Sequence, residues 1–173
     1  MATVQKGEFW LSGPIPGIIP VLQPAAHAIL QSQKEVQEAV QNFPEVLLWQ
    51  QPVGVASVAF HLQHLAGVLD RLFTYARGEQ LSALQLEALK KEGSEDKNIH
   101  LDDLLQQFNS QVNAAIEQLK NTKEESVFET RYVGRKQIPS NMLGLLFHAA
   151  EHTQRHTGQL LVTARILSSM EKL

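Results

Sequence analysis

The chain has 173 residues, of which 43% are hydrophobic and 19% are charged, with a net charge of −3 and no cysteine. This length suits one domain that buries about two thirds of its unfolded surface, so folding needs neither a disulfide nor a structural metal. The absence of cysteine excludes a disulfide scaffold, a cysteine-ligated zinc site and a cysteine nucleophile.

Proline and glycine dominate the start of the chain. Four prolines interrupt the stretch from Gly13 to Pro24, which therefore lacks the continuous apolar region of a signal peptide. We predict that residues 1–18 form an arm lying across the domain, and that residues 19–173 form one helical domain.

Two long amphipathic helices are predicted next. Apolar residues recur at steps of three and four from Ile19 to Asn42, and Pro44 ends this pattern. A second helix is predicted to begin at Gly54 or Val55 and to end at Ala76. Arg77 and Gly78 then supply the basic last turn and glycine that commonly terminate helices.

A short helix and a third long helix follow. Ser82 and Gln85 have the spacing of a capping box, which predicts a short helix over residues 83–91. Inward-facing apolar residues recur over residues 101–120, which predicts the third long helix.

The last third of the chain ends in a fourth long helix. Residues 121–139 are irregular, with a short extended piece predicted before Gly134. Ser140 is the predicted N-cap of a helix over residues 141–170. Four long amphipathic segments joined by modest loops predict an all-α four-helix bundle with one short extra helix.

Five of the seven histidines lie in two short windows. One window holds His61 and His64, and the other holds His148, His152 and His156. Any single histidine on an apolar helix face is more often a core or surface residue than a metal ligand. Two clusters on two helices of one predicted bundle instead favour a shared site.

In the last helix, His152 and His156 occupy positions that face the predicted core. Residues four apart lie one above the other on a helix, so their two rings can bind one metal ion. His148 lies about a quarter turn away from this face, which favours a place beside the site. On the second helix, periodicity slightly favours His61 over His64 as the core-facing residue.

The segments 57–67 and 146–159 resemble the DinB-like superfamily of metal-binding four-helix proteins. The resemblance rests on a histidine in a His-Leu-Ala context, here at His64, and on an HxxxH pair followed by a polar residue, here His152, His156 and Gln159. It implies a bundle of the up-down-down-up type. It also implies a metal site of His64, His152 and His156, which overrules the preference for His61.

Relatives of this kind bind divalent nickel, zinc or manganese, and some are S-transferases or isomerases that use a low-molecular-weight thiol such as bacillithiol or mycothiol. The resemblance also implies a homodimer. Three histidine ligands with open positions are typical of a catalytic rather than a structural metal site. Because the chain has no cysteine, a thiol nucleophile would come from such a cofactor.

Several polar side chains are candidates for orienting the ligands or transferring protons. They are His61, His148, Glu151, Arg155 and Gln159. Glu151 and Arg155 are four residues apart, and the alternative for them is a surface ion pair. The catalytic residues themselves stay unassigned.

Two functions of different classes are therefore open. One is a metal-dependent enzyme acting on a small molecule, as a thiol-dependent S-transferase or a hydrolase. The alternative is a bundle that binds or senses a metal or small ligand without turnover. A pI near 6.2 with scattered charges of both signs argues against a nucleic-acid partner. No uninterrupted apolar run approaches the length of a membrane span, so we expect a cytoplasmic protein without a membrane partner.

Overall fold

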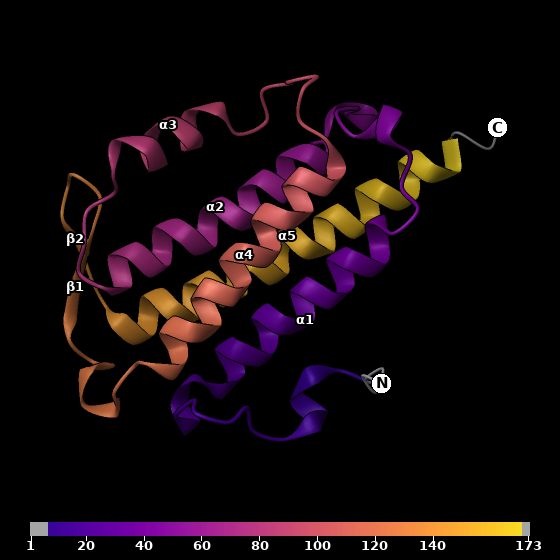
Figure 1. The fold of residues 1–173 in the computed structure, drawn as a ribbon. Helices are drawn as coiled ribbons and strands as arrows, with labels where there is room; N and C mark the ends of the chain where they lie inside the picture. Colours follow the sequence, from indigo (N-terminus) through magenta and orange to yellow (C-terminus); the bar gives the residue numbers. More distant parts are fainter. Residues whose placement is uncertain (1–6, 171–173) are drawn as a thin grey trace.

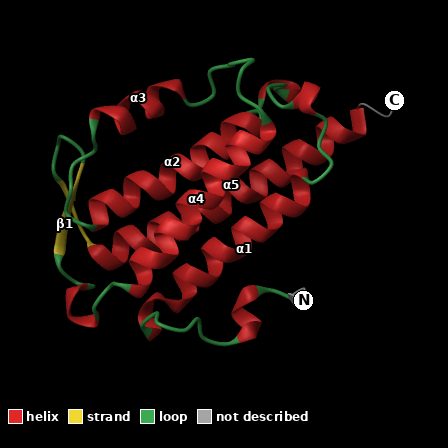
Figure 2. Ribbon diagram, in the orientation of Figure 1, coloured by secondary structure: helices red, strands yellow, loops and turns green. Residues whose placement is uncertain are grey.

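The computed structural model describes residues 7–170, and four long helices dominate it (Figures 1 and 2). They are α1 (Gln23–Val40), α2 (Val58–Ala76), α4 (Leu101–Lys120) and α5 (Met142–Met170). A short helix, α3 (Ala83–Lys91), lies between α2 and α4, and the strands β1 (Thr130–Val133) and β2 (Ile138–Asn141) lie between α4 and α5. The described chain is therefore mainly helical, with a small sheet.

The helices α2 and α5 form the centre of the molecule. Helix α2 packs against α4 and α5, and α1 packs against α5 and α4. Their facing sides carry large side chains with less than 2% of their surface exposed, including Ile29, Leu62, Leu65, Leu69, Phe108, Leu119, Leu146 and Leu160. Burial of this apolar surface is the main force that holds the helices together.

The first two helices begin later than their patterns predict. Pro20–Leu22 forms a 3-10 turn, and α1 begins at Gln23 with Pro24 in its first turn, where a proline costs no hydrogen bond. Helix α2 begins at Val58 because the hydroxyl of Ser57 accepts a hydrogen bond from the Phe60 backbone N–H at 3.1 Å.

The predictions for α3 and α4 are confirmed in their bounds. Ser82 and Gln85 form the predicted capping box at the start of α3, where each side chain bonds the other residue's backbone N–H. Helix α4 spans Leu101–Lys120, and Asp103 bonds the backbone of His100 at its start.

The irregular segment before α5 contains an antiparallel hairpin. The predicted extended piece is β1, and its partner strand β2 was not predicted because Pro139 disfavours a strand. At the start of α5, the Asn141 side chain accepts a hydrogen bond from the Gly144 N–H at 2.7 Å. The prediction that Ser140 provides this cap is therefore wrong by one residue.

The arm folds back beside α1 (Figure 1). The Gln23 side chain bonds the backbone of both Ile15 and Ile18, and Gln31 accepts a hydrogen bond from the Phe9 N–H at 3.1 Å. The first six residues of the predicted arm and the last three of the predicted domain lie outside the described residues. The boundary between residues 18 and 19 stays a prediction.

The most apolar helical segment, Pro52–Ala76, is long and apolar enough to cross a membrane by length and composition. However, 56% of its most apolar window is buried inside the protein, as in the core helix of a soluble domain.

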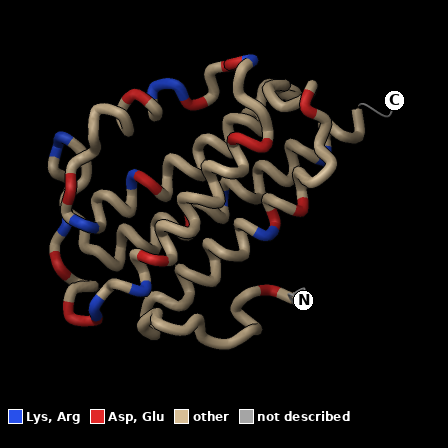
Figure 3. Tube along the Cα trace, viewed as in Figure 1, with Lys and Arg blue, Asp and Glu red and all other residues tan. Residues whose placement is uncertain are grey.

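Figure 3 shows lysine and arginine interspersed with aspartate and glutamate around α3 and the loops.

Candidate metal centre

Three histidines from α2 and α5 converge in the middle of the helix pair. His64, His152 and His156 each offer a ring nitrogen within 4.8 Å of the other two, and all three residues are half-buried. The ring of His156 lies 4.3 Å from that of His64 and 4.7 Å from that of His152, between ring centroids. The structure thus brings together the three residues that the resemblance selects.

The closest approach within this group joins two nitrogen atoms. His64 Nε2 lies 2.9 Å from His152 Nε2. Two nitrogen lone pairs repel at that distance, so either one ring donates a hydrogen to the other or a cation lies between them. The buried Nδ1 of His152 has no hydrogen-bond partner among the described residues. This geometry fits a site for one cation.

A buried carboxylate orients the ring of His64. His64 Nδ1 lies 2.7 Å from an oxygen of Glu92, whose other oxygen accepts a hydrogen bond from Arg71. The side chains of Glu92 and Arg71 are only 9% and 11% exposed. Burial alone would raise the pKa of Glu92, but the hydrogen bonds from His64 and Arg71 outweigh it and lower the pKa. Since an ionised carboxylate only accepts, His64 carries a hydrogen on Nδ1, and Nε2 is the nitrogen that faces the other histidines.

Two features of α2 allow the segment after α3 to reach the site. A side-chain carbon at Gly67 would collide with both Arg71 and Glu92, so the glycine leaves the space that their ion pair occupies. The Gln63 side chain accepts a hydrogen bond from the Gly93 backbone at 2.8 Å. These contacts hold Glu92 against α2, although it is far from His64 in the sequence.

Glu92 was not predicted from the sequence. Glu92 precedes a polar loop, where a carboxylate has no pattern that marks it as buried. The sequence contains one weak sign of a buried contact at this position. Gly67 interrupts an apolar helix, and such a glycine often lets another segment approach the helix backbone closely.

His61 lies beside the three-histidine group and not within it. It is 3% exposed, and its Nδ1 lies 3.4 Å from Nδ1 of His156. Burial, with a smaller effect of His64, lowers the pKa of His61 to about 4. Burial and the neighbouring histidines lower the pKa of His156 to about 4, and burial is the main cause that lowers the pKa of His152. His61, His152 and His156 are therefore neutral at pH 7. The neutral ring is the form in which a histidine binds a metal ion.

The remaining candidates lie on the outer side of α5. Glu151 forms an ion pair with Arg155, as expected for surface charges, and one of its oxygens lies 3.4 Å from Nδ1 of His148. Glu151, His148 and His152 also bring ligand atoms within 4.8 Å of one another, but His148 is exposed and all three come from one helix. Gln159 is exposed, one turn beyond His156. Glu92, and not Glu151, is therefore the carboxylate that orients a ring of the three-histidine group.

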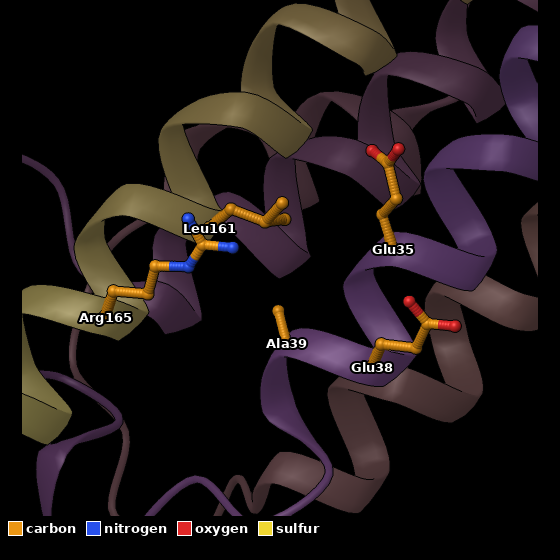
Figure 4. A pocket seen from close by; sticks show the side chains of 5 residues that line it. All are labelled: Glu35, Glu38, Ala39, Leu161 and Arg165. Carbon is orange, nitrogen blue, oxygen red and sulfur yellow. The ribbon is translucent and has the colours of Figure 1, made fainter.

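Cavities lie on both sides of the histidines. One of about 240 Å³ is lined by His148, His152 and Arg71 among others, and one of about 580 Å³ is lined by His61, Arg155 and Gln159 among others. A third hollow, of about 310 Å³, lies between α1 and α5 (Figure 4). Its polar side chains are those of Glu35, Glu38 and Arg165, and no histidine lines it, so we do not assign it to the candidate site.

Comparison with known proteins identifies the same family as the motifs do. The family model of the DinB superfamily matches residues 28–160. No curated protein matches the chain. The matched residues include all three histidines of the group, and they also include Glu92.

Solved structures share the fold. A conserved protein from Enterococcus faecalis has a TM-score of 0.70 at 16% identity, covering 87% of this chain and 99% of that one. A protein from Streptococcus pneumoniae has a TM-score of 0.61 at 15% identity, covering 84% and 88% of the two chains. An uncharacterized protein from Clostridium difficile 630 has a TM-score of 0.61 at 13% identity, covering 84% and 94%. At these identities the likeness shows the fold alone.

Proposed function

This chain belongs to the DinB superfamily, and we propose that it is an enzyme that uses one divalent metal ion bound by His64, His152 and His156. The observation that carries this proposal is the convergence of three ring nitrogens within 4.8 Å, from two helices. The Glu92 carboxylate supports it, because metal-binding histidines commonly donate their second N–H to such a group.

The proposal includes a four-helix bundle of the up-down-down-up type. In Figure 1, α1 and α5 run in one direction, and α2 and α4 run in the opposite direction. The short helix α3 then belongs to the long connection between the two parallel helices α2 and α4. This connection brings Glu92 to the site, which gives the crossover a functional role.

The donor set favours zinc or nickel over manganese. Imidazole nitrogen suits zinc and nickel, whereas manganese prefers carboxylate, carbonyl and water oxygens. All three proposed ligands are imidazoles, and the nearby carboxylate of Glu92 is already bonded to His64 and Arg71. Three protein ligands also leave positions for a substrate, as in catalytic sites.

When bound, such an ion acts as a Lewis acid toward a carbonyl or a thiol. The chain's own residues position the groups around it. Glu92 fixes the ring of His64, and the Arg71 guanidinium fixes Glu92 in turn. A pKa near 4 makes His61 a hydrogen-bonding group at neutral pH rather than a proton carrier.

We place a thiol-dependent S-transferase first and a hydrolase second. No described residue that lines the 580 Å³ cavity beside His61 carries a carboxylate that could serve as a general base toward water. A thiol needs less help from a base than water does, and it would be a low-molecular-weight cofactor because the chain has no cysteine. The partners in this proposal are a small substrate and a second copy of the chain, in the cytoplasm, without nucleic acid or membrane.

Metal content tests the proposal directly. Mass spectrometry on untagged protein should find about one ion per chain after reconstitution with zinc or nickel. The ion should be lost in His64→Ala and retained in His61→Ala, which removes a neighbouring buried histidine and serves as the matched control. Wild-type protein that binds no metal, or equal loss in both variants, would refute the site.

A non-catalytic binding or sensing protein is the alternative from the sequence. It predicts the same metal content but no turnover with any thiol. Screening the loaded protein with bacillithiol-type and mycothiol-type thiols and small electrophiles therefore separates the two functions.

A further inference from the structure

The cavity of about 580 Å³ lies against α5 on the side of His61. Its volume is in the range of small-molecule sites. His61 connects it to the three-histidine group, because its ring lines the cavity while its Nδ1 lies 3.4 Å from Nδ1 of His156. A molecule bound there would therefore lie next to the proposed metal centre.

The α5 wall of this cavity is polar near His156 and mainly apolar beyond it, with Thr163 as the one hydroxyl among the apolar residues. Arg155, Gln159, Val162 and Ile166 of α5 all line it, and their spacing of three or four residues places them on one helix face. At a rise of about 1.5 Å per residue, Arg155 and Ile166 are about 16 Å apart along the helix. The polar residues are those nearest His156 in the sequence, so the polar end is the end beside the metal centre.

Gly158 forms part of the same wall. It lies in the middle of α5, where glycine is among the least favourable residues, and a side-chain carbon there would meet nothing within 4 Å. No packing contact therefore requires a glycine at this position. Its effect is to keep the cavity open.

The lining outside α5 includes a strained residue. Val53 has a φ of 46°, in the left-handed region that branched side chains rarely adopt, and it is 92% exposed while lining the cavity. Strained backbone of this kind clusters at binding sites.

The polar groups at the inner end are hydrogen-bond donors. The Arg155 guanidinium only donates, and its Nη2 forms an ion pair with Glu151. Gln159 and the ring of His61 each offer an N–H donor as well. No carboxylate lines the cavity among residues 7–170. An occupant therefore needs an apolar body and an end that accepts hydrogen bonds.

We propose that this cavity binds a small monocarboxylate with an apolar body, its carboxylate at Arg155 and Gln159 and its body along Val162 and Ile166. The inference deepens the proposed function, because it names the substrate class of the same site. Binding to the cavity itself does not require the metal, so the two proposals are tested separately.

The first test uses octanoate and the metal-free protein, followed by amide NMR. Octanoate should shift the signals of Gly158 and Val162 in a saturable way, and octan-1-ol and octylamine should bind at least about tenfold more weakly. Gly158→Leu adds a side chain to the cavity wall at a position where a Cβ would meet nothing within 4 Å. It should weaken octanoate binding at least about tenfold, and the variant should bind as much metal as the wild type after reconstitution. Ala114→Leu adds the same side chain to an exposed position of α4 and should bind octanoate as the wild type does.

Each contrary result overturns a stated part of the inference. Equal octanoate binding by Gly158→Leu and wild type, or no binding at all, overturns the cavity as the site. Equal binding of octan-1-ol or octylamine overturns the carboxylate end. Metal content, measured on separate samples of the same proteins after reconstitution, reports on the proposed function alone.

The second test determines the orientation of the ligand. In protein reconstituted with paramagnetic Co²⁺, the octanoate protons next to the carboxylate should relax faster than the terminal methyl protons. The reverse order would overturn the proposed orientation, whereas equal slow relaxation in a loaded protein would show that octanoate binds away from the metal centre.

Discussion

Removal of the Glu92 charge should weaken metal binding from outside the set of ligands. In Glu92→Gln, the amide oxygen can still accept the hydrogen of His64 Nδ1, but it leaves the guanidinium of Arg71 without a counter-charge. In Glu92→Ala, His64 also loses the acceptor that fixes its ring, the carboxylate oxygen that lies 2.7 Å from Nδ1 in the wild type. Glu92→Gln therefore removes only the negative charge beside Arg71, whereas Glu92→Ala removes both this charge and the acceptor for His64.

The structure sets the expected magnitude. Loss of a partner that orients a ligating histidine typically costs about 10- to 100-fold in metal affinity, or about 1.4 to 2.7 kcal/mol. We expect the lower value for Glu92→Gln and the upper value for Glu92→Ala. Because the Glu92 and Arg71 side chains are 9% and 11% exposed, the metal-free Glu92→Ala protein should also lose about 3 kcal/mol of unfolding free energy.

Calorimetric titration with Zn²⁺, in competition with a chelator, measures the affinity, and urea unfolding of the metal-free protein measures stability. Glu87→Gln is the matched control, because Glu87 of α3 pairs with Lys91 while its side chain is 59% exposed. It should change neither quantity measurably. If Glu92→Ala binds Zn²⁺ as tightly as the wild type, the inferred orientation of His64 is wrong.

Three further predictions follow from the same site. The pKa of about 4 for His61, against 6.5 in the unfolded chain, means that the unfolded state binds more protons between these values. His61 alone should therefore cost the metal-free protein about 3 kcal/mol of unfolding free energy as the pH falls from 6.5 to 4, and His156, whose pKa is also about 4, adds its own cost. Urea unfolding from pH 7 to 4.5 should show this slope, reduced in His61→Gln, and an identical slope in both proteins would contradict the assignment. Gly67→Ala should displace the ion pair of Arg71 and Glu92 and weaken Zn²⁺ binding about tenfold, an effect that titration would detect. Millimolar thiol should change the visible spectrum of the Co²⁺-loaded protein, and an unchanged spectrum would count against the S-transferase while leaving the hydrolase open.

The helices could be predicted from the sequence because each has a repeating apolar pattern that local physics determines. Residues 101–120 have this pattern from end to end, and the predicted helix matches α4 in both bounds. Helix starts were less predictable, since a single side-chain hydrogen bond decides them, as at Ser57 and Asn141. The strand β2 contains a proline and has no pattern of its own, so only its pairing with β1 defines it.

The candidate site shows a similar limit. His152 and His156 could be paired from their spacing, because one helix sets their separation. The choice of His64 over His61 depended on the family motif, since both lie on the inner side of α2. Glu92 could not be predicted, because its contact with His64 spans 28 residues and depends on how the connection through α3 folds back. Short-range contacts are readable from a pattern, whereas contacts across a long connection require the fold.

The apolar character of α2 has a consequence for how the chain is made. The most apolar window of Pro52–Ala76, which contains α2, has a mean hydropathy of 1.3, enough for a membrane span by composition. The partners of α2, the helices α4 and α5, are synthesised after it, and α5 ends only at Met170. At about 5 to 20 residues per second, α2 stays without its full set of partners for about 5 to 20 s on the ribosome. During that time a chaperone, or the machinery that recognises membrane helices, competes with folding for the helix that supplies His61 and His64.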